Sequence, residues 1–203
     1  MTTQSSSSAP KISVNYSTRV DKVGWRPRAA TSVRAVVAII ITVIMLIPVV
    51  WMGMTAFKPL VETTEEEFDQ IFALNAKGPY FAMQEAAKVI EDGGRIGNIS
   101  SDGTHIGLAN VTAYLGSKGA LEQFTKGLPY ELAPKGVTVN TVSPGFTETT
   151  MMPDTLREPG AQMSPFKRVG TPKDIADVVA FVLSEEARWL TGQNIHASGG
   201  VVM

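Results

Sequence analysis

The chain has no cysteine among its 203 residues, so it can form neither a disulfide nor a thiolate metal site. Its two histidines, His105 and His196, stand far apart in the sequence, and neither has a carboxylate nearby at metal-ligand spacing. We therefore expect no metal centre and treat each histidine as an ordinary loop or strand residue. The formal net charge is -1 and no basic stripe is interleaved with aromatic residues, which argues against nucleic acid as a partner.

Residues 35–57 contain no charged side chain. As a helix rising about 1.5 Å per residue, this stretch is long enough to cross a hydrocarbon core of about 30 Å, which predicts one transmembrane helix. A buried core helix is one alternative, but such a helix is seldom apolar on every face. A secretory signal is the other alternative, but the stretch does not end in a clear small-residue cleavage site.

Residues 1–34 are polar and basic, which predicts a disordered tail. Lysine and arginine precede the apolar stretch whereas acidic residues follow it, so the N-terminus is expected to stay in the cytoplasm. The short basic tail and the long apolar stretch, which closes with IPVVWMGMTAFKP, resemble the first membrane helix of a sugar-type ABC transporter permease over residues 1–58. The resemblance implies attachment to a membrane through residues 35–57.

From residue 60 to 203, helical patterns alternate with short β-branched runs, which predicts an α/β fold with a parallel sheet. The expected strands are residues 94–101, 137–143 and 193–198. A capping box of Thr64 with Glu67 opens a helix that Gly78 and Pro79 interrupt. Further helices are expected over residues 113–132 and from Thr171, with a loop between residues 146 and 170.

Tyr114 and Lys118 stand four residues apart on an expected helix, so both side chains project from one face. A lysine ammonium at this distance favours the phenolate and is expected to lower the pKa of the tyrosine, which suits a general acid or base. The pair alone occurs by chance on surface helices. However, Ser101 and the SPG of residues 143–145 end neighbouring strands, where ligands bind in parallel sheets.

These features sit within NAKGPYF, GRIGNISS, AYLGSKGALEQF, VNTVSPGFTET and LTGQNIHASGG, and in this order they resemble the short-chain dehydrogenase/reductase family over residues 60–203. The resemblance implies a partial Rossmann-like sheet with flanking helices and an NAD(P)-dependent oxidoreductase acting on a carbonyl or secondary alcohol. It implies that Tyr114 transfers the proton, Ser101 hydrogen-bonds the carbonyl oxygen, Lys118 lowers the tyrosine pKa and holds the nicotinamide ribose, and Asn75 holds a relay water.

The resemblance also implies NAD or NADP as the cofactor. Besides Tyr114 and Lys118, the residues that would contact its nicotinamide end are Pro144, Gly145, Thr147 and Thr149. The substrate would lie under residues 146–170, whose Met151, Met152, Met163 and Phe166 indicate either an apolar wall or the ordinary packing of a surface loop. The helix over residues 113–132 would also serve subunit pairing, which is compatible with a homo-oligomer.

The family's glycine-rich turn, which receives the cofactor pyrophosphate, has no counterpart before Asn75. The GTHIGLA of residues 103–109 imitates that turn, but it occupies the loop where the family shapes its substrate pocket. The sequence therefore predicts that the pyrophosphate site is absent and that the two resemblances join at residues 58–61. Further departures are Gly97 inside a strand, where an apolar residue is expected to pack better, and Pro129 inside a helix, which can cost about 3 kcal/mol but less near the helix end.

Two hypotheses follow. One is a short-chain oxidoreductase impaired by the missing cofactor-binding half. The other is a non-catalytic fusion or truncated chain that joins a permease leader to a reductase tail. Residues 35–57 predict a membrane location, whereas the reductase resemblance favours the cytoplasm.

Overall fold

The computed structural model describes Val36 and residues 38–42, 58–150 and 152–203, which fall into two compact units, Met1–Thr42 and Val43–Met203. In the first unit, Val36 and residues 38–42 are helical and exposed. The tail over residues 1–34 and most of the apolar stretch 35–57 lie outside the described residues. No helix in the described ranges is long and apolar enough to cross a membrane, so the transmembrane helix stays a prediction.

The second unit is built on three parallel strands, β1 (Arg95–Ile99), β2 (Thr138–Pro144) and β3 (Asn194–Ala197). Their order is β1-β2-β3, with Arg95 opposite Thr138 and Thr141 opposite Asn194. All three strands lie where the sequence predicts them, and the α/β fold with a parallel sheet is confirmed. Within the part of the chain that the structure describes, β1 pairs with β2 alone.

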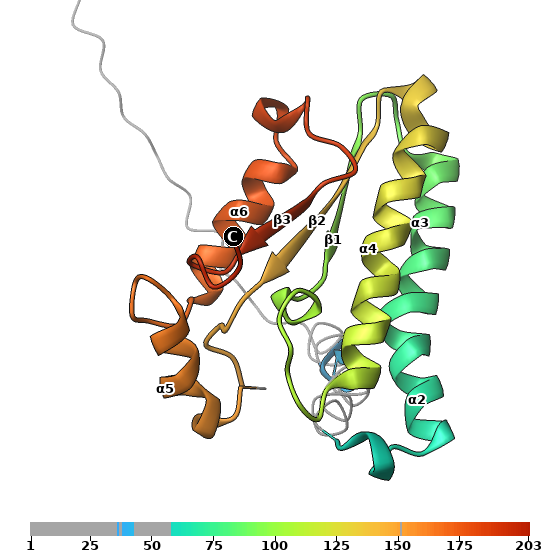
Figure 1. The fold of residues 1–203 in the computed structure, drawn as a ribbon. Coiled ribbons are helices and arrows are strands. Elements are labelled where there is room, and N and C mark those ends of the chain that lie inside the picture. The colour runs from blue at the N-terminus through green and yellow to red at the C-terminus, as the bar shows by residue number, and fades with distance from the viewer. Residues whose placement is uncertain (1–35, 37, 43–57, 151) are drawn as a thin grey trace, which may run out of the picture. The chain divides into compact units, whose positions relative to one another are not determined.

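Helices flank the sheet on both sides (Figure 1). On one side, α4 (Thr112–Leu132) contacts β2, and α2 (Glu65–Phe72) and α3 (Gly78–Val89) lie beside α4. On the other side, α6 (Pro172–Val182) contacts β2 and β3. Short helical turns complete the unit: η1 (Leu60–Glu62), η3 (Asp102–Thr104), η4 (Ala133–Lys135) and η5 (Glu185–Ala187).

The helix starts follow the predicted capping chemistry. The hydroxyl of Thr64 accepts a hydrogen bond from the backbone of Glu67, whose carboxylate accepts one from the backbone of Thr64. Thr171 caps α6 in the same way with Asp174, and Pro172 is the first helical residue. Between α2 and α3 the chain forms the π-helix η2 (Ala73–Lys77) and continues without a break through Gly78 and Pro79.

The apolar core lies toward the amino ends of the strands. Val137 and Val139 pack with Leu132 of α4, and the partly buried Ile96 of β1 joins them. Toward the carboxyl end of β2, by contrast, Thr141 and Ser143 are fully buried. Buried polar side chains therefore lie close to the candidate site, together with the buried Val142.

Two local expectations need correction. An apolar residue is expected to pack better than Gly97, but a Cβ there would lie 3.0 Å from Cδ2 of Leu183, so glycine makes room for that side chain. The helix predicted over residues 113–132 is confirmed, by contrast, because α4 contains Pro129 and continues for three residues to Leu132. Residues 146–170 are not a simple loop, because they contain α5 (Asp154–Met163).

Candidate active site

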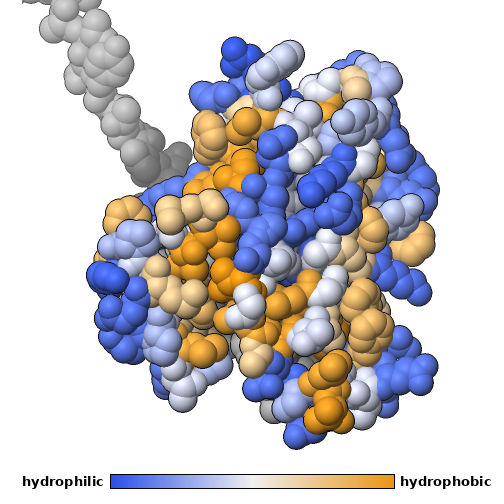
Figure 2. Space-filling model, in the orientation of Figure 1, coloured by the Kyte–Doolittle hydropathy of each residue, from blue (hydrophilic) through white to orange (hydrophobic). Residues whose placement is uncertain are grey.

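A cavity of about 410 Å³ opens at the carboxyl ends of β1 and β2. Its lining includes seven of the eight residues that the sequence singles out: Ser101, Tyr114, Lys118, Pro144, Gly145, Thr147 and Thr149. Most of the remaining wall is apolar and includes Ile106, Leu108, Val111, Leu115, Phe146, Met152, Leu156 and Val201. Figure 2 shows hydrophobic side chains gathered in this hollow, between the α5 side and the α4 side of the molecule.

Tyr114 and Lys118 lie on the first turns of α4 and face the same cavity, as their spacing predicts. The Nζ atom of Lys118 lies 5.8 Å from the centre of the Tyr114 ring. The ammonium donates a hydrogen bond to the carbonyl oxygen of Ile99, the last residue of β1, at 3.0 Å. The lysine therefore fixes the start of α4 against the end of β1.

The predicted electrostatics of this pair are wrong for the structure described. Burial raises the pKa of Tyr114 above its ordinary value of 10.0, and a hydrogen bond with Ser101 only partly opposes that rise. Burial also lowers the pKa of Lys118, because desolvation disfavours its charged form. Burial therefore sets the direction of the Tyr114 pKa, and the phenol carries its proton at neutral pH.

Ser101 lies two residues beyond the end of β1 at Ile99 and forms the N-terminal cap of η3. Its Oγ accepts a hydrogen bond from the backbone N–H of Gly103 at 3.2 Å. A serine hydroxyl can accept and donate at once, so this bond leaves the hydroxyl proton for the hydrogen bond with Tyr114, which opposes the rise of the Tyr114 pKa. The loop after it forms part of the cavity wall through Ile106 and Leu108, as expected for the GTHIGLA segment.

Asn75 does not line the cavity and lies behind it, in the π-helix η2. It is 5% exposed, and its side-chain amide donates to Oγ of Ser117 at 3.1 Å. Ser117 in turn donates to the carbonyl oxygen of Tyr114 at 2.6 Å. π-Helical turns occur often at functional sites, and here the turn brings Asn75 against the helix that carries the Tyr114–Lys118 pair.

The segment after β2 supplies the other predicted side of the cavity. Gly145 leaves no space for a side chain, because a Cβ there would lie 2.8 Å from Cα of Ser198. The hydroxyl of Thr147 donates to the carbonyl oxygen of Gly145 at 2.9 Å, and Thr147 bridges to the backbone of Gly170. Thr149 is exposed at the rim.

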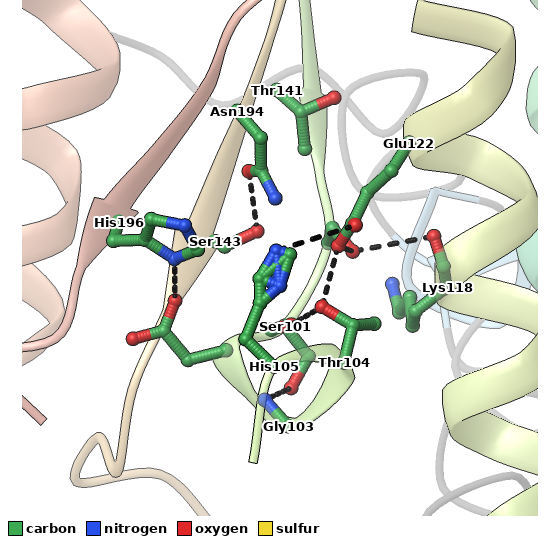
Figure 3. A network of polar contacts seen from close by, with 12 residues as sticks. Ser101, Gly103, Thr104, His105, Lys118, Glu122, Thr141, Ser143, Asn194 and His196 are labelled. Atoms are coloured by element: carbon green, nitrogen blue, oxygen red, sulfur yellow. Dashed lines mark hydrogen bonds and ion pairs between the residues drawn. The ribbon is translucent and has the colours of Figure 1, made fainter. Parts of the chain in front are cut away.

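A buried polar network lies next to the cavity, and sequence reasoning missed it (Figure 3). Nδ1 of His196 lies 2.5 Å from Oδ1 of Asp102, and the rings of His105 and His196 are 4.6 Å apart. Nε2 of His105 lies 3.9 Å from Oε2 of Glu122. The two histidines are therefore neighbours, not unrelated loop and strand residues. The described residues hold no group of three or more potential ligands arranged to hold a metal ion.

The profile of a family described as enoyl-(acyl carrier protein) reductase matches residues 28–202, which takes in the apolar stretch 35–57 as well as the second unit. A short-chain dehydrogenase/reductase of Pestalotiopsis microspora is 40% identical over 164 residues, covering 73% of this chain and 62% of that protein. A tetrahydroxynaphthalene reductase of Pestalotiopsis fici is 36% identical over 167 residues, covering 74% of this chain and 60% of that protein.

Solved structures of ketoreductases are also similar to this chain. The angucycline C-6 ketoreductase LanV with bound NADP is 44% identical, with a TM-score of 0.69, over 72% of this chain and 58% of that one. The same enzyme, described as a landomycin C-6 ketoreductase with NADP and rabelomycin, has a TM-score of 0.67 at 45% identity, over 72% of this chain and 57% of that one. This chain thus spans about three fifths of the length of these relatives.

Proposed function

Because the chain belongs to the short-chain dehydrogenase/reductase family, we propose that it is an NAD(P)-dependent oxidoreductase that reduces a ketone or oxidises the corresponding secondary alcohol. One observation carries this proposal: Ser101, Tyr114 and Lys118 meet on a single, mostly apolar cavity at the carboxyl ends of two parallel strands. A proton donor and a hydrogen-bond donor in an apolar cavity are the groups that reduction of a carbonyl needs.

In this proposal Tyr114 gives its proton to the carbonyl oxygen of the substrate. Burial raises its pKa, so the phenol is protonated at neutral pH and is the acid in the reducing direction. The hydroxyl of Ser101, which hydrogen-bonds Tyr114 here, would donate to the same oxygen and stabilise the negative charge that grows on it. Lys118 holds the start of α4 through Ile99, and Asn75 supports the same helix through Ser117.

The residues at the far side of the cavity fit the nicotinamide end of the cofactor. Gly145 brings the backbone close without a side chain, and the hydroxyls of Thr147 and Thr149 and the Lys118 ammonium supply polar groups for a carboxamide and a ribose. When bound, the cofactor supplies the hydride. Residues 1–74 contain only two glycines, Gly24 and Gly53, which supports the prediction that they form no glycine-rich pyrophosphate turn.

For the substrate we propose a largely apolar ketone fused to aromatic rings. Apolar side chains from three segments face the cavity, among them Leu108, Met152 and Leu156. Its volume of about 410 Å³ lies in the range of small-molecule sites. Reductases named for tetrahydroxynaphthalene and for angucycline ketones are among the similar proteins, which supports a multi-ring ketone.

Fluorescence titration of the purified chain with NADH and with NADPH tests the proposal. We expect saturable binding of at least one of them, followed by loss of its absorbance when a bicyclic aromatic ketone is added. Tyr114→Phe is the matched control, because it keeps the ring and removes the proton. If neither nucleotide binds saturably, the isolated chain is not an oxidoreductase, and the alternative of a non-catalytic fusion or truncated chain takes its place.

We also propose that residues 35–57 anchor the chain in a membrane, as a permease-like leader joined to a reductase part. The support is the absence of charge over this stretch. Carbonate extraction of membranes tests the anchor, because a spanning helix stays in the pellet. Release of the chain into the supernatant would contradict the anchor and favour a cytoplasmic location.

A homo-oligomer through α3 and α4 is a further part of the proposal. The aromatic rings of Tyr80 and Phe81 are about half exposed on α3, and the Tyr80 ring lies 5.2 Å from that of Phe124 on α4. Exposed aromatic side chains of this kind are typical of subunit interfaces. Light scattering after gel filtration should give the mass of a dimer or larger assembly, and Phe81→Glu should reduce it to that of one chain.

A further inference from the structure

The segment that carries Ser101 is held from two sides (Figure 3). On the α4 side, Oε1 of Glu122 accepts hydrogen bonds from Oγ of Ser100 at 2.6 Å and from Oγ1 of Thr104 at 2.8 Å. On the β3 side, Oδ1 of Asp102 lies 2.5 Å from Nδ1 of His196.

The buried carboxylate of Asp102 depends on the imidazole of His196 as its hydrogen-bond partner. Its side chain is 1% exposed, and its second oxygen, Oδ2, has no hydrogen-bond partner in the part of the chain that the structure describes. A carboxylate oxygen can only accept, so the short contact uses a proton carried on Nδ1 of the imidazole. A buried carboxylate without a partner is costly, so loss of the imidazole would drive Asp102 toward water.

A movement of the Asp102 backbone would also move Ser101. The two residues are adjacent, and the first turn of η3 joins them through three bonds: Gly103 N–H to Ser101 Oγ, Thr104 N–H to the Ser101 carbonyl, and His105 N–H to the Asp102 carbonyl. If the carboxylate turns outward together with its backbone, this turn rotates or opens. The hydroxyl of Ser101 would then leave its orientation toward the cavity.

We propose that His196 is a positioning residue, which fixes the catalytic hydroxyl of Ser101 by holding the buried carboxylate of Asp102 from the neighbouring strand. His196 itself does not line the cavity. The kinetic part of this inference rests on the proposed oxidoreductase function. The structural part, the order of the η3 turn, does not.

Three variants of the full chain test the inference. His196→Leu removes the ring nitrogens, whereas His196→Asn keeps an N–H donor near the position of Nδ1. Thr191→Val is the matched control, because the Thr191 hydroxyl accepts from the backbone of Val139 and its loss also breaks one contact to β2, near the opposite end of the sheet.

The first readout is hydrogen exchange of the Gly103 amide, which can be measured whether or not the chain is active. In His196→Leu we expect exchange to become about ten-fold faster or more, the factor given by losing one charge-assisted hydrogen bond. The second readout is steady-state kinetics with NADPH and the ketone. Here kcat should fall about 10- to 100-fold with KM little changed, since a small displacement of a catalytic group acts on the chemical step.

His196→Asn should restore both readouts to near the parent values, and Thr191→Val should change the unfolding temperature without changing either. Unchanged Gly103 exchange in His196→Leu overturns the inference, and so does equal damage in His196→Leu and His196→Asn. Faster exchange with parent kcat would also overturn it, because the turn would then not control Ser101. A parent chain that reduces no ketone refutes the proposed function instead, while the exchange result still decides the positioning of η3.

Discussion

Glu122 offers the sharpest test of how the Ser101 segment is anchored. Its side chain is 6% exposed, and its Oε1 accepts from Ser100 at 2.6 Å and from Thr104 at 2.8 Å. Hydrogen bonds to a charged group contribute about 1.5–3 kcal/mol each, so Glu122→Ala removes about 3–6 kcal/mol of interaction.

The Glu122→Ala variant recovers part of this lost interaction energy. Ser100 Oγ also lies 3.3 Å from the carbonyl oxygen of Lys118, and Thr104 Oγ1 lies 2.8 Å from that of Ser101, so both hydroxyls keep an acceptor. Removal of a buried charge also returns its desolvation cost. We therefore expect Glu122→Ala to lower the free energy of unfolding by about 2–4 kcal/mol, a large share of the total stability of an ordinary domain.

Urea unfolding with a shared m-value measures this loss. Glu122→Gln keeps an oxygen acceptor at the same place, so its cost should stay below about 1.5 kcal/mol. Glu131→Ala, at an exposed glutamate of the same helix, is the control and should change stability by no more than about 0.5 kcal/mol. A loss below about 1 kcal/mol in Glu122→Ala, or equal losses in the alanine and glutamine variants, would refute the reasoning.

Four further predictions concern Tyr114, Gly97 and Leu156, two of them for Tyr114. Tyr114→Phe should lower kcat about 10²- to 10⁴-fold while the Kd for the nucleotide stays within about three-fold; a small loss of kcat would rule out Tyr114 as the acid. Because burial raises the Tyr114 pKa above 10.0, the unfolded chain loses this proton first, so stability falls as pH rises past 10.0. Urea unfolding of Tyr114→Phe should show a shallower fall there, and parallel curves would contradict the pKa direction. Gly97→Val should cost about 1–3 kcal/mol by overpacking against Leu183, and clearly less in a Leu183→Ala background; additive losses would exclude that contact. Leu156→Asn should raise KM for an apolar ketone about ten-fold in initial-rate assays, and an unchanged KM would place the substrate elsewhere.

Local chemistry explains why much of the fold could be predicted from the sequence. Capping at Thr64 and Thr171 depends on residues three positions apart, and the strands are set by β-branched runs, so neither needs long-range information. Tyr114 and Lys118 share a face through the helical repeat alone. Ser101 and Gly145 meet at one cavity because the carboxyl ends of adjacent parallel strands lie at one edge of the sheet.

Long-range pairing explains what could not be predicted. His196 meets Asp102 across 94 positions of sequence, and no local pattern in QNIHAS signals that partner. The sequence makes Gly97 look like a packing defect because it does not reveal that Leu183, at the C-terminal end of α6, fills the space beside this glycine. The direction of the Tyr114 pKa depends on how deeply α4 is buried, which the Tyr-to-Lys spacing does not contain. α5 was missed because Pro159 and Gly160 lie inside it.

The buried polar network next to the cavity costs stability, and this cost indicates that the network has another role. Ser100, Asp102, Glu122 and Ser143 occupy interior positions, where apolar side chains of similar volume would pack without needing partners. Replacing a complete buried polar set with apolar residues is often neutral or stabilising, whereas breaking one member is not. Stability alone therefore does not explain why these residues lie beside Ser101 instead of an apolar core like that around Val139. Their directional bonds fix the orientation of the η3 turn, which non-directional apolar packing does not. An apolar replacement of the whole set should therefore preserve stability better than it preserves kcat.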